Sequence, residues 1–162
     1  MEKLTQKWCI ASFFEELKDG FEFDRSDNPL HITLAGVFAL DLNGLEIVKI
    51  FEDLLKNTKS FSVTAGKDTY WGENKNIQVV LIQDSKELKS LQMNIYNKLI
   101  SKGAIFNEPE YEGEGHTSHS TVQKVGKLSE GEIVTINKVS IVDMFPNNDG
   151  YRRKIVKTVK LA

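Results

Sequence analysis

Two short segments of the sequence pair a histidine with a threonine in the same order. They are HITL at 31–34 and HSTV at 119–122, and each reads histidine, any residue, threonine and an aliphatic residue. In a strand, residues i and i+2 point to the same face, about 7 Å apart along the chain. Each segment, if extended, therefore presents an imidazole beside a hydroxyl.

These residue types suit the cleavage of a phosphodiester. If the two strands lie side by side, four groups converge: His31, Thr33, His119 and Thr121. One histidine can remove a proton from the attacking oxygen and the other can protonate the leaving oxygen, since an unperturbed imidazole titrates near working pH. Either histidine could take either role. The two hydroxyls can donate hydrogen bonds to phosphate oxygens, so this chemistry requires no metal and no cofactor.

The surrounding sequence predicts strands that would position these groups. Apolar and β-branched residues alternate with polar ones around His31, and several other segments have the same composition between Gly, Asn and Pro turns. The polar stretch 18–29 is expected to be a loop, and the last three strands to form an antiparallel meander. The predicted strands, about seven in all, cover 7–14, 30–38, 61–71, 77–83, 119–125, 132–145 and 152–161.

Two amphipathic helices are predicted between the strands. The first covers 43–57, with Asn43 and Glu46 as a capping box and an apolar stripe formed by Leu45, Val48, Phe51, Leu54 and Leu55. The second begins at Asp84 or Ser85 and ends before Gly103, and its apolar residues are Leu88, Leu91, Ile95 and Leu99. Strands and helices in this order indicate an α+β fold.

The paired motifs and the order of elements resemble the 2H (two-histidine) phosphoesterases, whose best-known branch is the 2′-5′ RNA ligase and cyclic phosphodiesterase group. The resemblance implies a two-lobed α+β fold of antiparallel sheets and two main helices, with a cleft between pseudo-twofold lobes. It also implies metal-independent action on 2′,3′-cyclic phosphates or 2′-5′ linkages. Members of this superfamily often carry an arginine five positions after the second histidine. Lys124 stands there in this chain, and Gly36 at the matching position after the first.

Other residues are candidates for substrate binding. Lys124 supplies a positive charge without the two-pronged geometry of arginine. Tyr70 and Trp71, at the end of a strand, could stack a base at about 1–3 kcal/mol each, or could pack on the core. His116 is three residues from His119, so in a continuous strand it would face the opposite side. We expect it in a loop at the cleft rim.

A zinc site is the competing interpretation of the histidines. Three imidazoles with Glu112 or Glu114 could bind zinc in principle. However, the histidines lack the i, i+4 spacing of a helical zinc motif, and no cysteine accompanies them. The lone Cys9 lies among apolar residues and is expected to be a buried structural thiol. We therefore expect no metal.

Composition limits the classes of partner. The formal net charge of −2 gives no global basic field, which disfavours duplex DNA and leaves a nucleotide, short RNA or cyclic oligonucleotide as the substrate. The N-terminus lacks the pattern of a signal peptide, and no apolar run is long enough to span a membrane. A single cysteine fits a reducing compartment. We expect one domain over 1–162, a monomer, in the cytoplasm, or in a host's cytoplasm if the protein is viral.

Two alternatives to a general phosphodiesterase remain at this point. One is an enzyme that degrades cyclic or 2′-5′-linked signalling nucleotides, including immune signals, as some cellular and viral members of the superfamily do. The other is a non-catalytic module that binds RNA or a nucleotide on the same scaffold. Binding alone would not require two titratable imidazoles, and this favours the enzyme.

Overall fold

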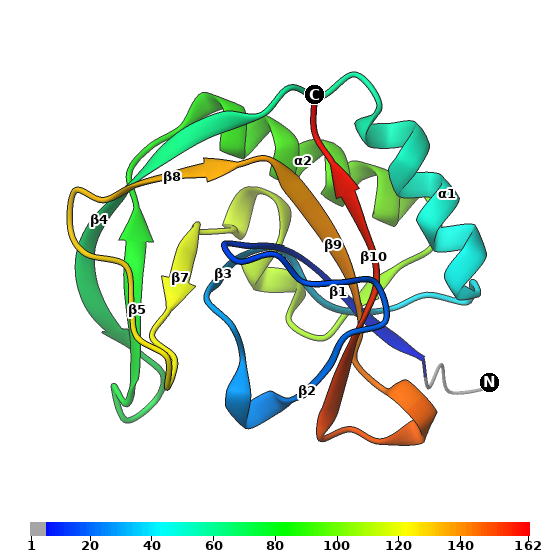
Figure 1. Cartoon of the computed structure of the whole chain (residues 1–162), viewed down its shortest axis with the longest axis horizontal. Helices are drawn as coiled ribbons and strands as arrows, with labels where there is room; N and C mark the ends of the chain where they lie inside the picture. Colours follow the sequence, from blue (N-terminus) through cyan, green and yellow to red (C-terminus); the bar gives the residue numbers. More distant parts are fainter. Residues whose placement is uncertain (1–5) are drawn as a thin grey trace.

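A computed structural model describes residues 6–162 and shows a chain built from two antiparallel sheets with two long helices along one side (Figure 1). The N-terminal segment, in which we predict no signal peptide, includes residues 1–5, which lie outside the described residues. No helix in the described part of the chain is long and apolar enough to cross a membrane. The two sheets define two lobes, and the histidine motifs lie one in each.

The first lobe contains a six-stranded sheet in the order β2-β10-β9-β1-β3-β6. The central pairing joins β1 to β3, with Phe13 opposite His31. Strand β6 pairs only with the far end of β3, at Phe38 and Ala39, so the part of β3 that carries His31 has no strand on that side. The strands are β1 (Lys7–Phe13), β2 (Glu22–Asp24), β3 (His31–Ala39), β6 (Ile105–Phe106), β9 (Lys138–Asp143) and β10 (Arg152–Lys160).

The second lobe contains a four-stranded sheet in the order β7-β5-β4-β8. The long strand β4 pairs with β8 along its first half and with β5 along its second half. Strand β7 lies at the edge of this sheet, where His119 is opposite Leu81 of β5. The strands are β4 (Phe61–Trp71), β5 (Ile77–Ile82), β7 (His119–Thr121) and β8 (Ile133–Ile136).

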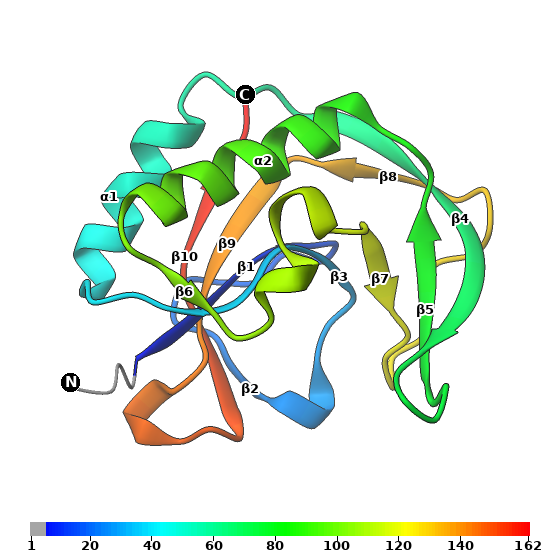
Figure 2. The ribbon, with the colours of Figure 1, turned by 180° about the vertical axis from the view of Figure 1, so that it is seen from behind.

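Helices α1 (Gly44–Leu55) and α2 (Lys86–Ser101) are the two predicted helices, although α1 ends two residues before the predicted end at 57. Asn43 and Glu46 form the capping box of α1, and the Ser85 hydroxyl caps α2. Gly103, just beyond α2, has a φ of +91°, a conformation that favours glycine. The view from behind shows both helices lying along the same side of the molecule (Figure 2).

The predicted apolar stripe is correct for α2 and only partly correct for α1. All four predicted apolar residues of α2 are buried, which confirms that stripe. In α1, Phe51 and Leu55 are buried, but Leu45 is 85% exposed and Ile47 is fully buried in its place. The stripe of α1 is thus rotated from the predicted one, because the sheet contacts the helix along the Ile47 row. Together with residues of both sheets, the two helices form one large apolar core.

Several predicted segments differ from the structure. The expected loop 18–29 contains β2, which pairs with β10, and a short 3-10 helix, η1 (Arg25–Asp27). The single strand predicted over 132–145 divides at Asn137 into β8 and β9, which belong to different sheets. The predicted meander is therefore wrong: β9 pairs with β10, but β7 pairs with β5. Strand β7 ends at Thr121 rather than at Val125, and residues 6–162 form ten strands, not seven.

The segment between β6 and β7 is fastened to β3 by one carboxyl group. Its short helices are η2 (Pro109–Tyr111) and η3 (Gly113–Gly115), and between them Glu112 Oε1 accepts a hydrogen bond from the backbone N–H of Gly36 at 2.8 Å. A side chain at position 36 would overlap this oxygen and would push the Glu112 carboxyl away from the Gly36 N–H. The loop thus continues the edge of β3 where β6 stops, and it leads directly to His119.

Two half-buried titratable groups, Glu112 and Cys9, lie at this contact. Burial raises the pKa of Glu112 to about 7, with Glu108 adding to the shift and the Gly36 hydrogen bond opposing it. Burial also raises the pKa of the Cys9 thiol to about 12, so Cys9 stays protonated and donates to the carbonyl of Ala35. This places Cys9 as a structural thiol rather than a nucleophile.

Glu112→Gln should stabilise the protein more as the pH rises. Between pH 4.5 and about 7 the carboxyl holds its proton in the folded chain but not in the unfolded chain, so the wild type loses stability as the pH rises through this window. The glutamine does not titrate, yet it keeps an acceptor for Gly36. Urea unfolding at pH 4 to 8 should show a gap between the two proteins that opens across this window and then levels off.

Glu114→Gln is the matched control, because Glu114 is exposed on the same loop. This variant should not reproduce the widening gap expected for Glu112→Gln. A gap for Glu112→Gln that stays flat or closes as the pH rises would contradict the buried carboxyl described here.

Candidate active site

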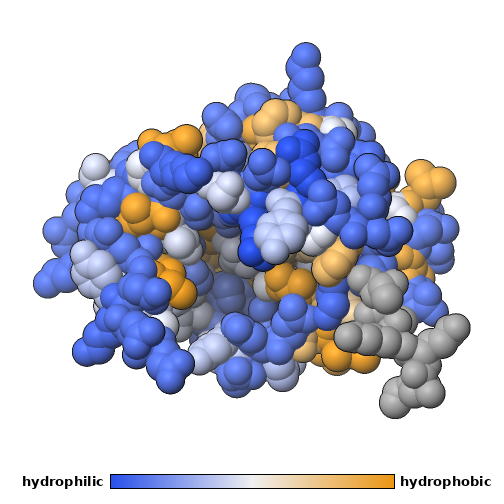
Figure 3. All heavy atoms as spheres, turned by 90° about the horizontal axis from the view of Figure 1, so that it is seen from below, coloured by the Kyte–Doolittle hydropathy of each residue, from blue (hydrophilic) through white to orange (hydrophobic). Residues whose placement is uncertain are grey.

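The two histidine motifs meet where the lobes meet. Strand β7 is the edge of the four-stranded sheet, and the His31 end of β3 has no strand on its second side, so these two edges face each other. The strands contact one another without belonging to one sheet, and both ribbon views show them as neighbours (Figures 1 and 2). The protein face below these strands is hollowed at its centre (Figure 3).

Both motifs have the same pattern of burial. His31 and Thr33 are half-buried, while Ile32 between them is fully buried in the core; His119 and Thr121 are half-buried on either side of the buried Ser120. In each strand the imidazole and the hydroxyl therefore share one face, and the middle residue anchors the opposite face. The structure brings together the four residues that the sequence selects.

Each histidine is held by a backbone carbonyl two residues before it. His31 Nδ1 lies 2.8 Å from the Pro29 oxygen, and His119 Nδ1 lies 2.9 Å from the Thr117 oxygen. A carbonyl only accepts hydrogen bonds, so Nδ1 must be the protonated nitrogen in both rings. In the neutral state Nε2 then carries the lone pair, which is the form that a general base requires.

An aromatic ring packs against each imidazole. Phe13 lies opposite His31 in the β1–β3 pair, with ring centroids 5.0 Å apart. Trp71 of β4 meets His119 edge-on, with centroids 4.5 Å apart. Together with the carbonyl bonds, these contacts leave each imidazole little freedom to rotate. In both lobes, therefore, the histidine is held by one carbonyl and one aromatic ring.

Burial sets the charge state of the two histidines. It lowers the pKa of His31 below its ordinary value of 6.5, and the nearby His119 lowers it further. Burial also lowers the pKa of His119, against the opposing effect of the Thr117 carbonyl. The strands that carry the two rings contact each other. Both rings are neutral at pH 7, and protonating one disfavours protonating the other.

The threonine hydroxyls are available to a ligand. Neither Thr33 nor Thr121 forms a side-chain hydrogen bond with another residue within 6–162, whereas the strand residue Thr158 bonds to Ser140. A half-buried hydroxyl on the same face as an imidazole is suited to donate to a phosphate oxygen.

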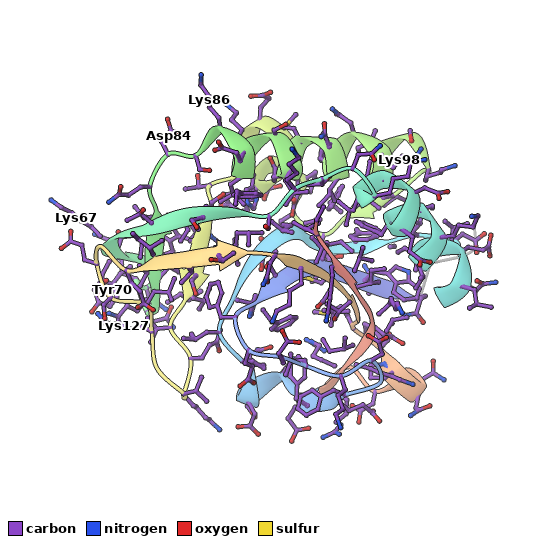
Figure 4. All side chains as sticks on the ribbon, turned by 45° about the horizontal axis from the view of Figure 1, so that its top comes forward. Lys67, Tyr70, Asp84, Lys86, Lys98 and Lys127 are labelled. Atoms are coloured by element: carbon purple, nitrogen blue, oxygen red, sulfur yellow. The ribbon has the colours of Figure 1, made fainter. Side chains whose placement is uncertain are left out.

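The two candidate stacking residues point to opposite faces of β4. Trp71 contacts His119, so it lies at the site. Tyr70 is its neighbour in an extended strand and faces away, 55% exposed. Figure 4 shows Tyr70 on the outer side of the second lobe, with Lys67 and Lys127 beside it. The structure therefore places Trp71, and not Tyr70, next to the histidine pair.

Lys124 bridges the two lobes. It follows β7, and its ammonium lies 3.3 Å from the carboxylate of Asp27 in η1. Both side chains are well exposed, so the pair contributes little to stability. An anionic ligand entering between the lobes would compete with Asp27 for this ammonium. Sequence reasoning missed Asp27, because no local signal shows that η1 faces the end of β7.

His116 lies outside the motif strands, in the loop between η3 and β7. It is half-buried, and burial together with the neighbouring His119 lowers its pKa, against the effect of the Tyr111 carbonyl. His116 therefore lies near His119, but in the loop before β7 and not on a motif strand. Nowhere in 6–162 do three or more histidine, cysteine, aspartate or glutamate side chains cluster closely enough to hold a metal ion.

Comparison by sequence gives no relative. No family model matches the chain, and no curated protein is similar enough in sequence to be matched.

Comparison by structure gives several relatives over nearly the whole chain. A phosphoesterase crystal structure matches with a TM-score of 0.65 and 12% identity, over 97% of this chain and 99% of its own. E. coli LigT complexed with 3′-AMP matches with a TM-score of 0.62 and 12% identity, over 97% and 98%. A Thermus thermophilus protein, TT0787, matches with a TM-score of 0.60 and 11% identity, over 96% and 97%. The chain therefore has the two-lobed α+β fold of LigT, which is the fold that its resemblance to the 2H phosphoesterases predicts.

Proposed function

We propose that this protein is a metal-independent phosphodiesterase in which His31 and His119 are the acid–base pair. Its substrate is a cyclic phosphate or a 2′-5′ or 3′-5′ phosphodiester in a nucleotide or oligonucleotide. The observation that supports this most strongly is the repeated geometry of the two histidines. Each donates Nδ1–H to a carbonyl two residues before it, packs on an aromatic ring and shares its face with a threonine.

The reaction requires one proton to be taken up and one to be delivered. The neutral histidine accepts a proton at Nε2 from the attacking water as its oxygen bonds to phosphorus. The protonated histidine gives its proton to the ribose oxygen as the bond from that oxygen to phosphorus breaks. The pair ends with its protons exchanged and its total charge unchanged. For a linear phosphodiester, a ribose hydroxyl can replace water as the attacking group.

Other residues of the site would hold the phosphate. Thr33 and Thr121 donate hydrogen bonds to the non-bridging oxygens, on which negative charge increases in the transition state. Lys124 exchanges its contact with Asp27 for a contact with the phosphate. This contact lies at the exposed mouth of the site, so it should affect binding more than the chemical step.

A nucleotide is the proposed substrate class. LigT has been crystallised with 3′-AMP and with NADP+, and this chain shares its fold. Trp71 beside His119 offers an aromatic surface for a base next to the reacting phosphate. Tyr70 could contact only a segment that passes around the outside of the second lobe. Cyclic oligonucleotides and 2′-5′ oligoadenylates are the alternative substrates within this class.

His31→Ala and His119→Ala should each reduce turnover by about 10²–10⁴-fold, because each variant lacks one proton-transfer group. Hydrolysis of 2′,3′-cyclic AMP and of a 2′-5′-linked diadenylate, measured by chromatography with EDTA present, tests this. His116→Ala is the matched control and should stay near wild-type turnover. A histidine variant that folds and retains full activity would refute the acid–base assignment. A wild type that binds these compounds but cleaves none of them would instead indicate a binding module.

Thr33→Val and Thr121→Val keep the shape of the side chain and remove the proposed donor. Each should lower kcat/KM by about 30- to 1000-fold, which corresponds to about 2–4 kcal/mol of transition-state stabilisation. Thr64→Val serves as the control, since Thr64 is a half-buried strand threonine at the other end of β4. Normal kinetics in both motif variants would show that these threonines only stabilise their strands.

A further inference from the structure

One cavity lies outside the proposed catalytic site. It has a volume of about 300 Å³ and is formed by the first turns of α2, the end of β5 and the loop before β7. We call it the α2 pocket, and define it by Ser85, Leu88 and Gln92 of the helix and His116, Thr117 and Ser118 of the loop. None of the four motif residues lines it. Figure 2 shows the loop beneath α2, and Figure 4 labels Asp84, a lining residue just before α2.

The wall of the α2 pocket contains two buried nitrogen atoms without partners. Gln92 is only 3% exposed, and its Nε2 forms no hydrogen bond to any other part of residues 6–162. The same holds for Nε2 of His116. Buried polar groups are normally satisfied, and an unpaired one lowers stability. Gln92 and His116 both line the cavity, so a ligand that enters it can pair with these nitrogens when the two side chains turn toward it.

The two nitrogens are a donor and an acceptor, and both side chains are uncharged. Gln92 Nε2 donates. With its proton on Nδ1, the His116 ring is the acceptor of the two. Nε2 has no partner, and the neutral ring presents its lone pair there. Burial lowers the pKa of His116, which keeps the ring neutral at pH 7.

The remaining lining selects against a charged ligand. Two carboxylates, Asp84 and Glu114, stand against one ammonium, Lys89, so an anion is not favoured. Ile82 and Leu88 add apolar surface on which a flat ring can lie. The volume is at the lower end of the range for ligand sites, enough for one ring system rather than for an oligonucleotide.

We propose that the α2 pocket binds the nucleobase of a nucleoside. A nucleobase is flat and uncharged, and the adenine edge carries an acceptor, N7, next to a donor, the N6 amino group. Gln92 would donate to N7, and His116 Nε2 would accept from N6. This site is separate from the proposed catalysis and does not depend on it. Thr117 lines the pocket, and its carbonyl accepts the hydrogen bond from His119 Nδ1. A bound base should therefore also change the NMR signals of His119.

Adenosine, which has no phosphate, is the probe that tests this site. Calorimetric titration should show binding to the wild type, and Gln92→Leu should weaken it about tenfold or more because the donor is lost. Asn94→Leu is the matched control: it removes an exposed amide from the same helix and should change nothing. His31→Ala alters the catalytic cleft and should bind adenosine as the wild type does.

Amide chemical shifts of the wild-type protein provide a second measurement that needs no variant. Adenosine should shift signals of 85–92 and 113–119 and leave those of 31–33 in place. The proposal is overturned if adenosine does not bind, if Gln92→Leu binds it normally, or if the shifts map to the catalytic cleft. Failure of the histidine variants to lose phosphodiesterase activity would leave this result unaffected, so the two proposals fail separately.

Discussion

The hydrogen bond from each histidine Nδ1 to a carbonyl two residues earlier is the interaction on which the site depends. It fixes the tautomer, so that Nε2 is the free nitrogen, and it fixes the ring plane. It also requires the chain to leave the extended conformation just before each motif. Pro29 and Thr117 both lie outside strands, and proline, which has no N–H and a fixed φ, suits the first of these positions. The strand begins at the histidine itself in both lobes.

The arrangement of the sheets follows from the need to bring two strand edges together. Two strands in adjacent positions of one sheet would be joined by ladder hydrogen bonds, with the side chains of both facing the same way. Here β3 and β7 belong to different sheets and contact each other at their edges, so the two histidine motifs meet although the strands are not paired in one sheet. The short β6 leaves the His31 end of β3 uncovered, and the loop fastened through Glu112 and Gly36 continues that edge. The same loop delivers Thr117, and thus orients His119.

Local signals in the sequence predicted much of this, because they depend on residues close together in the chain. The alternation around His31, the capping box at Asn43 and the stop at Gly103 are of this kind. The aromatic partners of the histidines cannot be predicted in this way, because they are far from the histidines in the chain. Phe13 contacts His31 because the pairing of β1 with β3 places the two residues opposite each other. Trp71 of β4 contacts His119 of β7 past the intervening strand β5. The division of 132–145 into β8 and β9 was missed for the same reason: a continuous apolar pattern does not show that the chain passes from one sheet to another.

The dependence of kcat/KM on pH is the most direct test of the paired histidines, measured on 2′,3′-cyclic AMP with and without EDTA. The free enzyme needs one neutral and one protonated imidazole, so the profile should be bell-shaped. Burial lowers the pKa of both rings, so both limbs should fall below the ordinary value of 6.5 and the optimum should be acidic. The profile should be the same with the chelator. A profile with one limb, or activity that EDTA abolishes and zinc restores, would contradict the account.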